Sequence, residues 1–261
     1  MSLPRLTIIT PSLNQETYLE RAIRSVLEQG YPNLEYIVMD GGSTDGSVDV
    51  LRRFDSELAH WVSEPDQGQS HAINKGLARA TGDVVAYLNS DDYYVPGAFE
   101  AVLPLFADQN VSWVSGTCRY LFEDGRVETV WRPRLPRGPR GSWVRFSWAV
   151  PQPASFWRRG LFDRFGQFRE DLHYVLDTEF MLRIALAGCL PSIVDRELAV
   201  RWLHGQAKTA DWSQFEREFE LVARQLLGTL PRHERVLSWP YYAGLSVLRK
   251  LGLFRIRRDT S

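Results

Sequence analysis

The first hundred residues alternate short apolar runs with stretches of helical spacing, and only short polar loops separate them. Such an order is typical of strands and helices that follow one another along the chain. It predicts an α/β protein whose mostly parallel central sheet is flanked by helices. We expect strands at residues 6–9, 34–39, 58–63 and 84–88, and helices at residues 16–28, 48–54, 70–80 and 96–106.

The second half of the chain has a different pattern. A strand is expected at residues 111–118, then a hairpin at 119–130 with its turn at 123–126. Residues 131–145 are rich in proline and glycine and carry five arginines, which predicts a loop that is solvated or contacts phosphates. Amphipathic helices are expected at 176–187 and 212–227. We therefore predict a main domain over residues 1–210 and a C-terminal helical extension over residues 211–261.

Composition narrows the class of partner. The 31 basic and 32 acidic residues leave a net charge of −1, which does not favour a nucleic-acid binder. Cys118 and Cys189 are too few for a disulfide framework, so a reducing, cytoplasmic setting is expected. No apolar signal region opens the chain, and no run approaches the roughly 20 apolar residues of a membrane span.

The C-terminal tail has a distinctive composition. Residues 237–258 combine an apolar stripe with five basic side chains. This pattern is typical of a helix that lies on a membrane surface, here the inner face of the plasma membrane. The alternatives are a helix packed on the main domain with solvated arginines, or a contact between copies of the chain.

Two adjacent carboxylates, Asp91 and Asp92, follow the apolar run at residues 84–88. Carboxylates at the carboxyl end of a strand in an open α/β sheet lie where such folds bind ligands. Their oxygen atoms suit Mg²⁺ or Mn²⁺, and the natural companion of such an ion is a diphosphate. The competing interpretation is a polar turn, or a cap for the helix that Pro96 opens.

Other polar groups follow the neighbouring strands. Asp40 ends the second strand and can accept a hydrogen bond from the imide N–H of a uracil- or thymine-type base, or from a ribose hydroxyl. Asp45 is better placed to cap the next helix, because it directly precedes that helix. The remaining candidates for nucleotide contacts follow the first strand or open the third helix: Thr10, Pro11, Ser12, Asn14, Gly68, Asn74 and Lys75.

Several common signatures are missing from the sequence. It has no Gly-x-x-x-x-Gly-Lys-Ser/Thr run, which disfavours a P-loop triphosphatase. No Gly-x-Gly-x-x-Gly follows the first strand, which disfavours a nicotinamide dehydrogenase. No Gly-x-Ser-x-Gly is present either. A metal ion with a diphosphate is therefore the simplest interpretation of the acidic pair.

Asp177 and Glu179 open the helix expected at residues 176–187. Because they are two positions apart, at most one of them is expected to face a cleft. They are either acids that the helix dipole favours at a helix start, or they include a general base. His204 follows a short strand and could supply a nitrogen ligand to the ion.

In their order and spacing, these motifs make residues 6–210 resemble the family 2 glycosyltransferases, inverting enzymes of the GT-A fold. The resemblance rests on the runs at residues 10–14, 25–29, 40–46, 74–76, 80–83, 88–92 and 177–179. It implies that Asp40 reads the base, that Asp91 contacts the ribose, and that Asp92 holds the metal ion at the family's DXD-type motif. Asp177 aligns with the catalytic base, and His204 with a position that often joins the metal or diphosphate. Four residues are assigned to the donor-sugar and acceptor side: Asn89, Gln152, Trp157 and Glu179.

Three positions qualify the resemblance. Asn89 stands where the family often has the first acid of its metal motif, and Gly41 stands where a second acid often follows Asp40. Trp157 is either a wall on which a sugar stacks or a residue of the hydrophobic core.

The implied reaction is transfer of a hexose, with inversion, from a UDP- or dTDP-sugar to a hydroxyl of a saccharide or lipid-linked acceptor. It would depend on Mn²⁺ or Mg²⁺ and would belong to cell-envelope polysaccharide synthesis. One alternative is a sugar nucleotidyltransferase, which would normally show a glycine-rich basic loop after the first strand. The other is a non-catalytic nucleotide-sugar binder that partners a membrane synthase.

Overall fold

The computed structural model describes residues 3–123, 125–133, 135, 140, 150–205 and 212–234. Most of the basic loop at 131–145, the tail at 237–258 and the predicted domain boundary at 210 lie outside the described residues. The strands are β1 (Leu6–Ser12), β2 (Leu34–Asp40), β3 (His60–Ser63), β4 (Val84–Tyr87), β5 (Tyr93–Tyr94), β6 (Trp113–Phe122), β7 (Val127–Trp131), β8 (Ser155–Arg158) and β9 (Ser192–Leu203). The α-helices are α1 (Glu16–Leu27), α2 (Ser47–Arg53), α3 (Gln69–Arg79), α4 (Ala98–Val102), α5 (Gly160–Phe165), α6 (Leu176–Leu186) and α7 (Trp212–Gly228).

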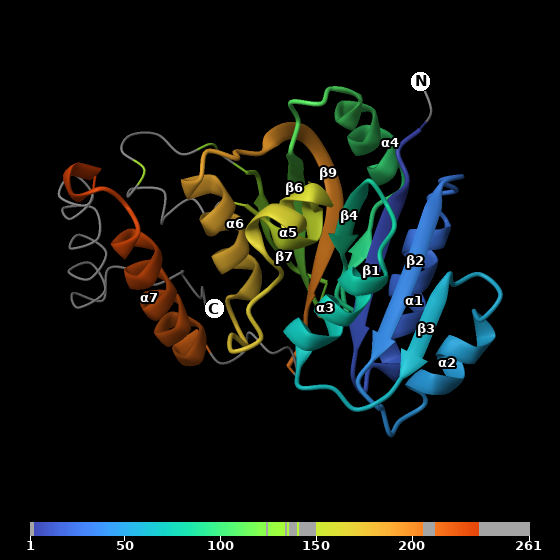
Figure 1. Ribbon diagram of the computed structural model, residues 1–261. Coiled ribbons are helices and arrows are strands. Elements are labelled where there is room, and N and C mark those ends of the chain that lie inside the picture. Colours follow the sequence, from blue (N-terminus) through green and yellow to red (C-terminus); the bar gives the residue numbers. More distant parts are fainter. Residues whose placement is uncertain are drawn as a thin grey trace.

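One mixed sheet runs through the molecule in the order β3-β2-β1-β4-β8-β6-β9-β5, with β7 paired to β6 (Figure 1). The first four strands pair in parallel, as the alternation of strands and helices predicts. Beyond β4 the pairing becomes antiparallel, except that β6 and β9 run parallel. The α/β fold class expected from the sequence is therefore confirmed.

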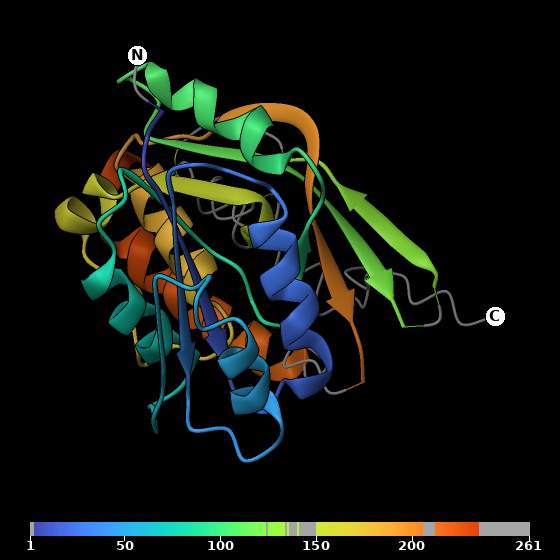
Figure 2. The same cartoon turned by 90° about the vertical axis from the view of Figure 1, so that its right-hand side faces the viewer.

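Both faces of the sheet are covered, because successive residues of a strand point to opposite faces. Leu6 and Ile8 of β1 are buried against α1 in one hydrophobic cluster. Ile9 is buried against α3 in the other cluster, which also includes residues of α5, α6 and α7. Figure 2 shows α1 and α3 on opposite sides of β1.

Strand β1 is longer than expected, because it continues through Pro11 to Ser12. Proline lacks an N–H and is normally excluded from central strands. Here β4 pairs with β1 only as far as Ile9, so beyond that residue β1 has β2 as its sole strand neighbour. The carbonyl of Ser12 accepts the N–H of Gly41 at 2.8 Å, so the backbone of Ser12 faces β2. Because neighbouring residues in a strand face opposite sides, the ring nitrogen of Pro11 points away from β2. The ladder therefore loses no bond.

Two other elements differ from expectation. The helix predicted at residues 96–106 splits into α4 and a 3₁₀ turn at Leu103–Ala107, since Pro104 has no N–H to continue an α-helix. The break expected after residue 118 is absent, and β6 runs to Phe122 before the hairpin turn into β7.

Helix α7 packs against α6, and Phe219, Val222 and Ala223 are buried in the cluster that contains α6 (Figure 1). Across the described residues, no helix has the length and apolar character needed to cross a membrane.

Candidate active site

The carboxyl ends of β1, β2 and β4 meet at one edge of the sheet, and polar side chains gather there. Ser12 lies opposite Asp40 in the parallel register, and Ile9 lies opposite Tyr87. The loop that carries Asp91 and Asp92 leaves β4 just beyond this point. The fold therefore brings together the polar segments that follow the first, second and fourth strands.

Asp40 is 2% exposed, and its carboxylate accepts four hydrogen bonds. The donors are the N–H groups of Gly42 and Ser43, at 3.2 and 2.8 Å, and the hydroxyls of Ser43 and Ser63, at 2.5 and 2.6 Å. These bonds fix the loop after β2 and attach it to β3. Asp40 thus lies at the predicted edge, where its carboxylate also organises the loop.

The residues after the start of β1 divide into supports and exposed groups. Thr10 and Pro11 are buried in the strand, and the Thr10 hydroxyl lies 3.0 Å from a tyrosine hydroxyl of β2. Asn14 has a φ of 53°, and its side-chain oxygen accepts the N–H of Thr44 at 2.9 Å. Ser12 has a buried hydroxyl at this edge of the sheet that makes no hydrogen bond to any described residue.

The residues predicted at the start of α3 do not all face the site. Gly68 precedes the helix with a φ of 117°, which favours glycine. Asn74 is 6% exposed, and its amide donates to the carbonyl of Phe168 at 2.8 Å and accepts the N–H of the same residue at 3.2 Å. Lys75 forms an ion pair with Glu64. The Asn74 side chain therefore anchors the segment around Phe168, and its role as a nucleotide ligand stays a prediction.

Asp91 and Asp92 have different surroundings. Asp92 is 1% exposed, and its carboxylate accepts the Trp202 N–H at 3.0 Å and the Asn89 side-chain amide at 3.3 Å. Burial, together with the charge of Asp91, raises the pKa of Asp92 to about 8. Asp91 Oδ2 lies 3.2 Å from His204 Nε2, and His204 Nδ1 is buried without a partner in the described part of the chain.

These side chains form the donor set available to a metal ion. Mg²⁺ is usually held by one or two carboxylates, with substrate phosphates and water completing its coordination. Within the part of the chain that the structure describes, no three His, Cys, Asp or Glu side chains converge as a metal site. An ion bound here would therefore depend on a diphosphate and water for most of its ligands.

Asp177 lies in the first turn of α6 and is partly exposed. Burial raises its pKa, while the Thr178 N–H, at 2.6 Å from Oδ1, and the charge of Arg201 act to lower it. Burial alone would lower the pKa of Arg201, but Tyr120, Asp92 and Asp177 together raise it. One arginine thus interacts electrostatically with both Asp92 and Asp177. Sequence reasoning missed it, because an arginine within a strand carries no motif.

Three residues that are predicted on the donor-sugar and acceptor side are buried. Glu179 is 2% exposed and accepts two hydrogen bonds from Arg183, at 2.9 and 2.8 Å. Gln152 is 6% exposed and donates to the carbonyl of Tyr87 at 2.7 Å. Trp157 is fully buried in the hydrophobic core, with Tyr87 stacked at a centroid distance of 6.3 Å. Only Asn89 of this group lies beside the acidic pair.

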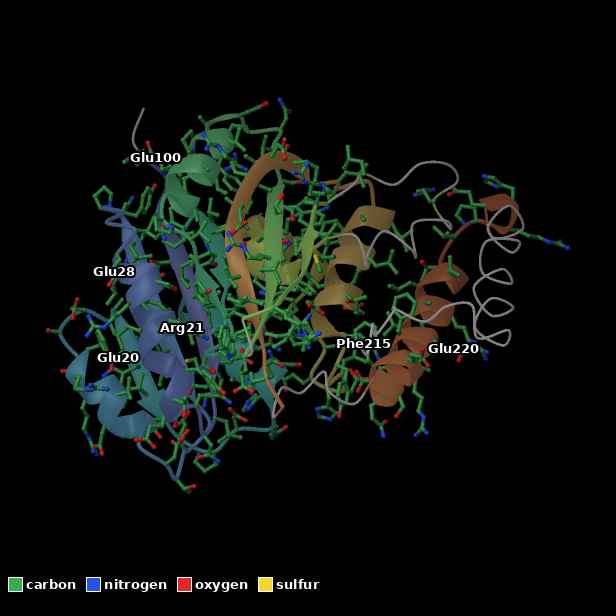
Figure 3. All side chains as sticks on the ribbon, turned by 180° about the vertical axis from the view of Figure 1, so that it is seen from behind. Glu20, Arg21, Glu28, Glu100, Phe215 and Glu220 are labelled. Carbon is green, nitrogen blue, oxygen red and sulfur yellow. The ribbon has the colours of Figure 1, made fainter. Side chains whose placement is uncertain are left out.

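Arg21 of α1, labelled in Figure 3, contacts the turn that carries the acidic pair. Its guanidinium lies over the rings of Tyr93 and Trp202, at 4.6 and 4.4 Å from their centroids, and donates to the carbonyl of Asp91 at 3.0 Å. The helical spacing of α1 gave no sign of this role. An adjoining cleft of about 350 Å³ is lined by Asn14, Gln15, Thr17, Tyr18, Glu123, His204 and Gly205.

Solved structures identify the class of fold. Over 98% of this chain, it superposes with a TM-score of 0.70 on 77% of a S. aureus TarS chain crystallised with UDP-GlcNAc, at 16% identity. It also superposes with a TM-score of 0.60 on 82% of the mannosyltransferase PcManGT from Pyrobaculum calidifontis, solved with GDP-Man and Mn²⁺, at 20% identity and over 98% of this chain. The fold is therefore the GT-A glycosyltransferase fold.

Sequence comparison identifies the family. The model for "Glycosyl transferase family 2" matches residues 7–183, and the chain belongs to that family. A Mycobacterium tuberculosis protein named as an uncharacterized glycosyltransferase is 36% identical over 197 residues, which are 73% of this chain and 72% of that protein. A Campylobacter jejuni protein named GalNAc(5)-diNAcBac-PP-undecaprenol beta-1,3-glucosyltransferase is 32% identical over 120 residues, 44% of this chain and 38% of that protein. The chain is thus a glycosyltransferase enzyme.

Proposed function

We propose that this glycosyltransferase inverts the anomeric centre of a nucleotide-diphosphate sugar, with Asp177 as the general base. The observation that carries the proposal is the position of Asp177. It is a partly exposed carboxylate with a raised pKa, and it shares the charge of Arg201 with Asp92. A base works best when its pKa lies closer to the working pH than that of an ordinary carboxylate.

The reaction is a single displacement. Asp177 takes the proton from an acceptor hydroxyl while the hydroxyl oxygen forms a bond to the anomeric carbon. The bond from that carbon to the diphosphate breaks, and its electrons leave with the nucleoside diphosphate. Because the new bond forms opposite the breaking bond, the configuration at the anomeric carbon inverts.

A divalent cation, Mn²⁺ or Mg²⁺, is part of the proposal. Asp92 would hold it, with Asp91 and His204 beside it, and His204 Nδ1 is an unused buried nitrogen in the described part of the site. When bound, the ion supplies neutralisation of the charge that grows on the departing diphosphate. The raised pKa of Asp92 agrees with this role. Burial and the charge of Asp91 disfavour its ionised form, which a bound cation would stabilise.

The donor we propose is a UDP- or dTDP-sugar. The nucleotide would lie along the edge formed by Ser12, Asp40 and Asp91, with the ribose at Asp91. Gly68, which precedes α3, and Lys75, which pairs with Glu64 after β3, belong to the proposed contacts. Support comes from the fold neighbour that was crystallised with UDP-GlcNAc.

The acceptor we propose is a saccharide or a lipid-linked saccharide of the cell envelope. The Campylobacter jejuni relative is named for such a lipid-linked substrate. The basic and apolar composition of residues 237–258 would suit a peripheral contact with an anionic membrane. Full-length protein should then sediment with vesicles of anionic lipid at low salt, and a chain ending at Arg235 should not. Equal sedimentation of the two chains would remove the tail from this role.

A thermal-shift panel of UDP-, dTDP- and GDP-sugars, each with and without Mn²⁺, tests the donor assignment. A ligand present at about 100 times its Kd stabilises the folded state by about 2.7 kcal/mol. For a chain of this size that stabilisation corresponds to a rise of about 5–10 °C in Tm. We expect the rise with a UDP- or dTDP-sugar and Mn²⁺. A flat response to every donor would contradict the proposal.

A further inference from the structure

The segment between α5 and α6, residues 166–175, leads directly to Asp177 and is held on one side by α3. The amide of Asn74 bonds both the N–H and the carbonyl of Phe168, at 3.2 and 2.8 Å. The Ser70 hydroxyl donates to the carbonyl of Leu172 at 2.9 Å. Both side chains are buried, so these tethers are protected from water.

On its other side the same segment is held by α7. The carboxylate of Glu218 accepts three consecutive backbone N–H groups, those of His173 at 3.0 Å, Tyr174 at 2.7 Å and Val175 at 3.3 Å. These groups directly precede α6, which begins at Leu176. Hydrogen bonds from backbone N–H groups to a carboxylate are about twice as strong as those between neutral groups.

Glu218 places a negative charge just before the start of α6, which has no side-chain cap of its own. The residue before the helix, Val175, has no side chain that can cap it. The first N–H groups of a helix have no partners within the helix and attract negative charge. The Glu218 carboxylate instead accepts the N–H of Val175 and of the two residues before it, so it fixes the chain where it enters α6, two residues before Asp177.

The helix that carries Glu218 is firmly attached to α6. Phe219, Val222 and Ala223 of α7 are buried in the cluster that includes Phe180 and Ile184 of α6. Figure 1 shows the two helices side by side, and Figure 3 labels Phe215 and Glu220 on α7. Helix α7 lies beyond residues 7–183, the part of the chain that the family model matches.

We propose that Glu218 is a positioning residue for Asp177, so that α7 sets the placement of the general base. This inference rests on the proposed role of Asp177. A displacement of about 1 Å at a reacting group can lower the rate about 10²-fold. A general base typically contributes about 10²- to 10⁴-fold to the rate, so the loss of Glu218 cannot lower kcat by more than that factor.

The first test compares Glu218→Ala and Glu218→Gln with Glu220→Ala. Glu220 is on the same helix and pairs with Arg224 at its surface, so it is a matched control. We expect Glu218→Ala to lower kcat by roughly 10- to 100-fold, and Glu218→Gln by less, because its amide oxygen can still accept a hydrogen bond. In both Glu218 variants the affinity for UDP with Mn²⁺ should change by less than about twofold, since Glu218 lies on α7 and the proposed donor edge lies at β1, β2 and the turn after β4. Glu220→Ala should match the wild type in kcat and in UDP affinity.

Calorimetric titration with UDP and Mn²⁺ also counts the folded sites. Expressing kcat per binding site removes any loss of folded protein, and Glu218→Gln keeps the test usable where the alanine variant folds poorly. A wild-type kcat per site in both Glu218 variants would overturn the proposal.

The second test places Glu218→Ala in an Asp177→Asn background. If Glu218 acts through Asp177, the double variant should be within about twofold of Asp177→Asn alone, because coupled residues are not additive. If Glu218→Ala lowers kcat by the same factor in both backgrounds, the proposal is wrong. Should Asp177→Asn alone turn over like the wild type, the proposed general base itself would fail, which is a different outcome.

Discussion

Replacing Asp92 with Asn should stabilise the ion-free protein at neutral pH. Asp92 is 1% exposed, and burial and the charge of Asp91 raise its pKa to about 8. In the unfolded chain an aspartate has a pKa of about 3.9. Between these values the folded state holds a proton that the unfolded state has lost, and each pH unit costs about 1.4 kcal/mol of stability. The upper limit at pH 7 is therefore about 4 kcal/mol.

The real gain is smaller than this limit. The Asn side chain keeps one oxygen that can accept the Trp202 N–H, but its NH₂ group cannot accept the Asn89 side-chain amide. Relaxation around a buried charge also lowers its cost. We expect a gain of about 1–3 kcal/mol, or about 2–12 °C in Tm.

The sign of the pH dependence follows from the raised pKa. The stability that protonated Asp92 contributes is complete below about pH 4 and is lost as pH rises toward the folded-state pKa of about 8. Thermal unfolding in EDTA at pH 5 and pH 7 should show a larger advantage for Asp92→Asn at pH 7. With UDP and Mn²⁺ present the order should reverse, because in the proposed site only the wild type can bind the ion through Asp92. An Asn variant that melts at or below the wild type in EDTA at pH 7 would refute this reasoning.

Three further substitutions test other parts of the account. Arg201→Met should lower the free energy of unfolding by about 3 kcal/mol. It should also move the acid limb of the pH profile of kcat to higher pH, because Asp177 loses a positive charge that lowers its pKa. An acid limb that does not move would contradict this. Glu35→Gln should cost about 1–3 kcal/mol by urea unfolding at pH 7, because the Glu35 carboxylate accepts four hydrogen bonds where β1, β2 and β4 begin. Although burial opposes it, these bonds lower the pKa of Glu35, so the difference from the wild type should shrink as pH falls through that pKa and should not grow. Glu179→Gln should lower Tm with unchanged UDP affinity, and weaker UDP binding would restore a donor-side role for Glu179.

The first half of the fold could be predicted from the sequence, because its signals are local. Helix α1 has a repeating apolar stripe and a glycine stop, and it was found at Glu16–Leu27 against an expected 16–28. The end of β1 could not be predicted in this way. Pro11 breaks a strand only where a neighbour needs its N–H, and the pairing shows that β4 has already ended there.

The sequence indicates which loops form the candidate site, but it does not indicate which side chains contact one another there. Asp91 and Asp92 follow a strand and could be found from that position alone. The contacts of Asn74 with Phe168 join residues 94 positions apart, and a polar residue at a helix start gives no sign of its partner. Glu218 and Arg201 have no motif around them, so only the three-dimensional structure connects them with Asp177.

Turnover by Asp177→Asn is the most direct test of the proposed mechanism. The variant keeps the size of the side chain and removes its ability to take a proton. We expect kcat to fall by at least about 10²-fold, the usual lower limit for loss of a general base. The affinity for UDP with Mn²⁺ should remain close to that of the wild type, because Asp177 lies on α6, whereas the proposed nucleotide edge is formed by β1, β2 and the turn after β4. Turnover near the wild-type level would remove Asp177 from catalysis and contradict the account.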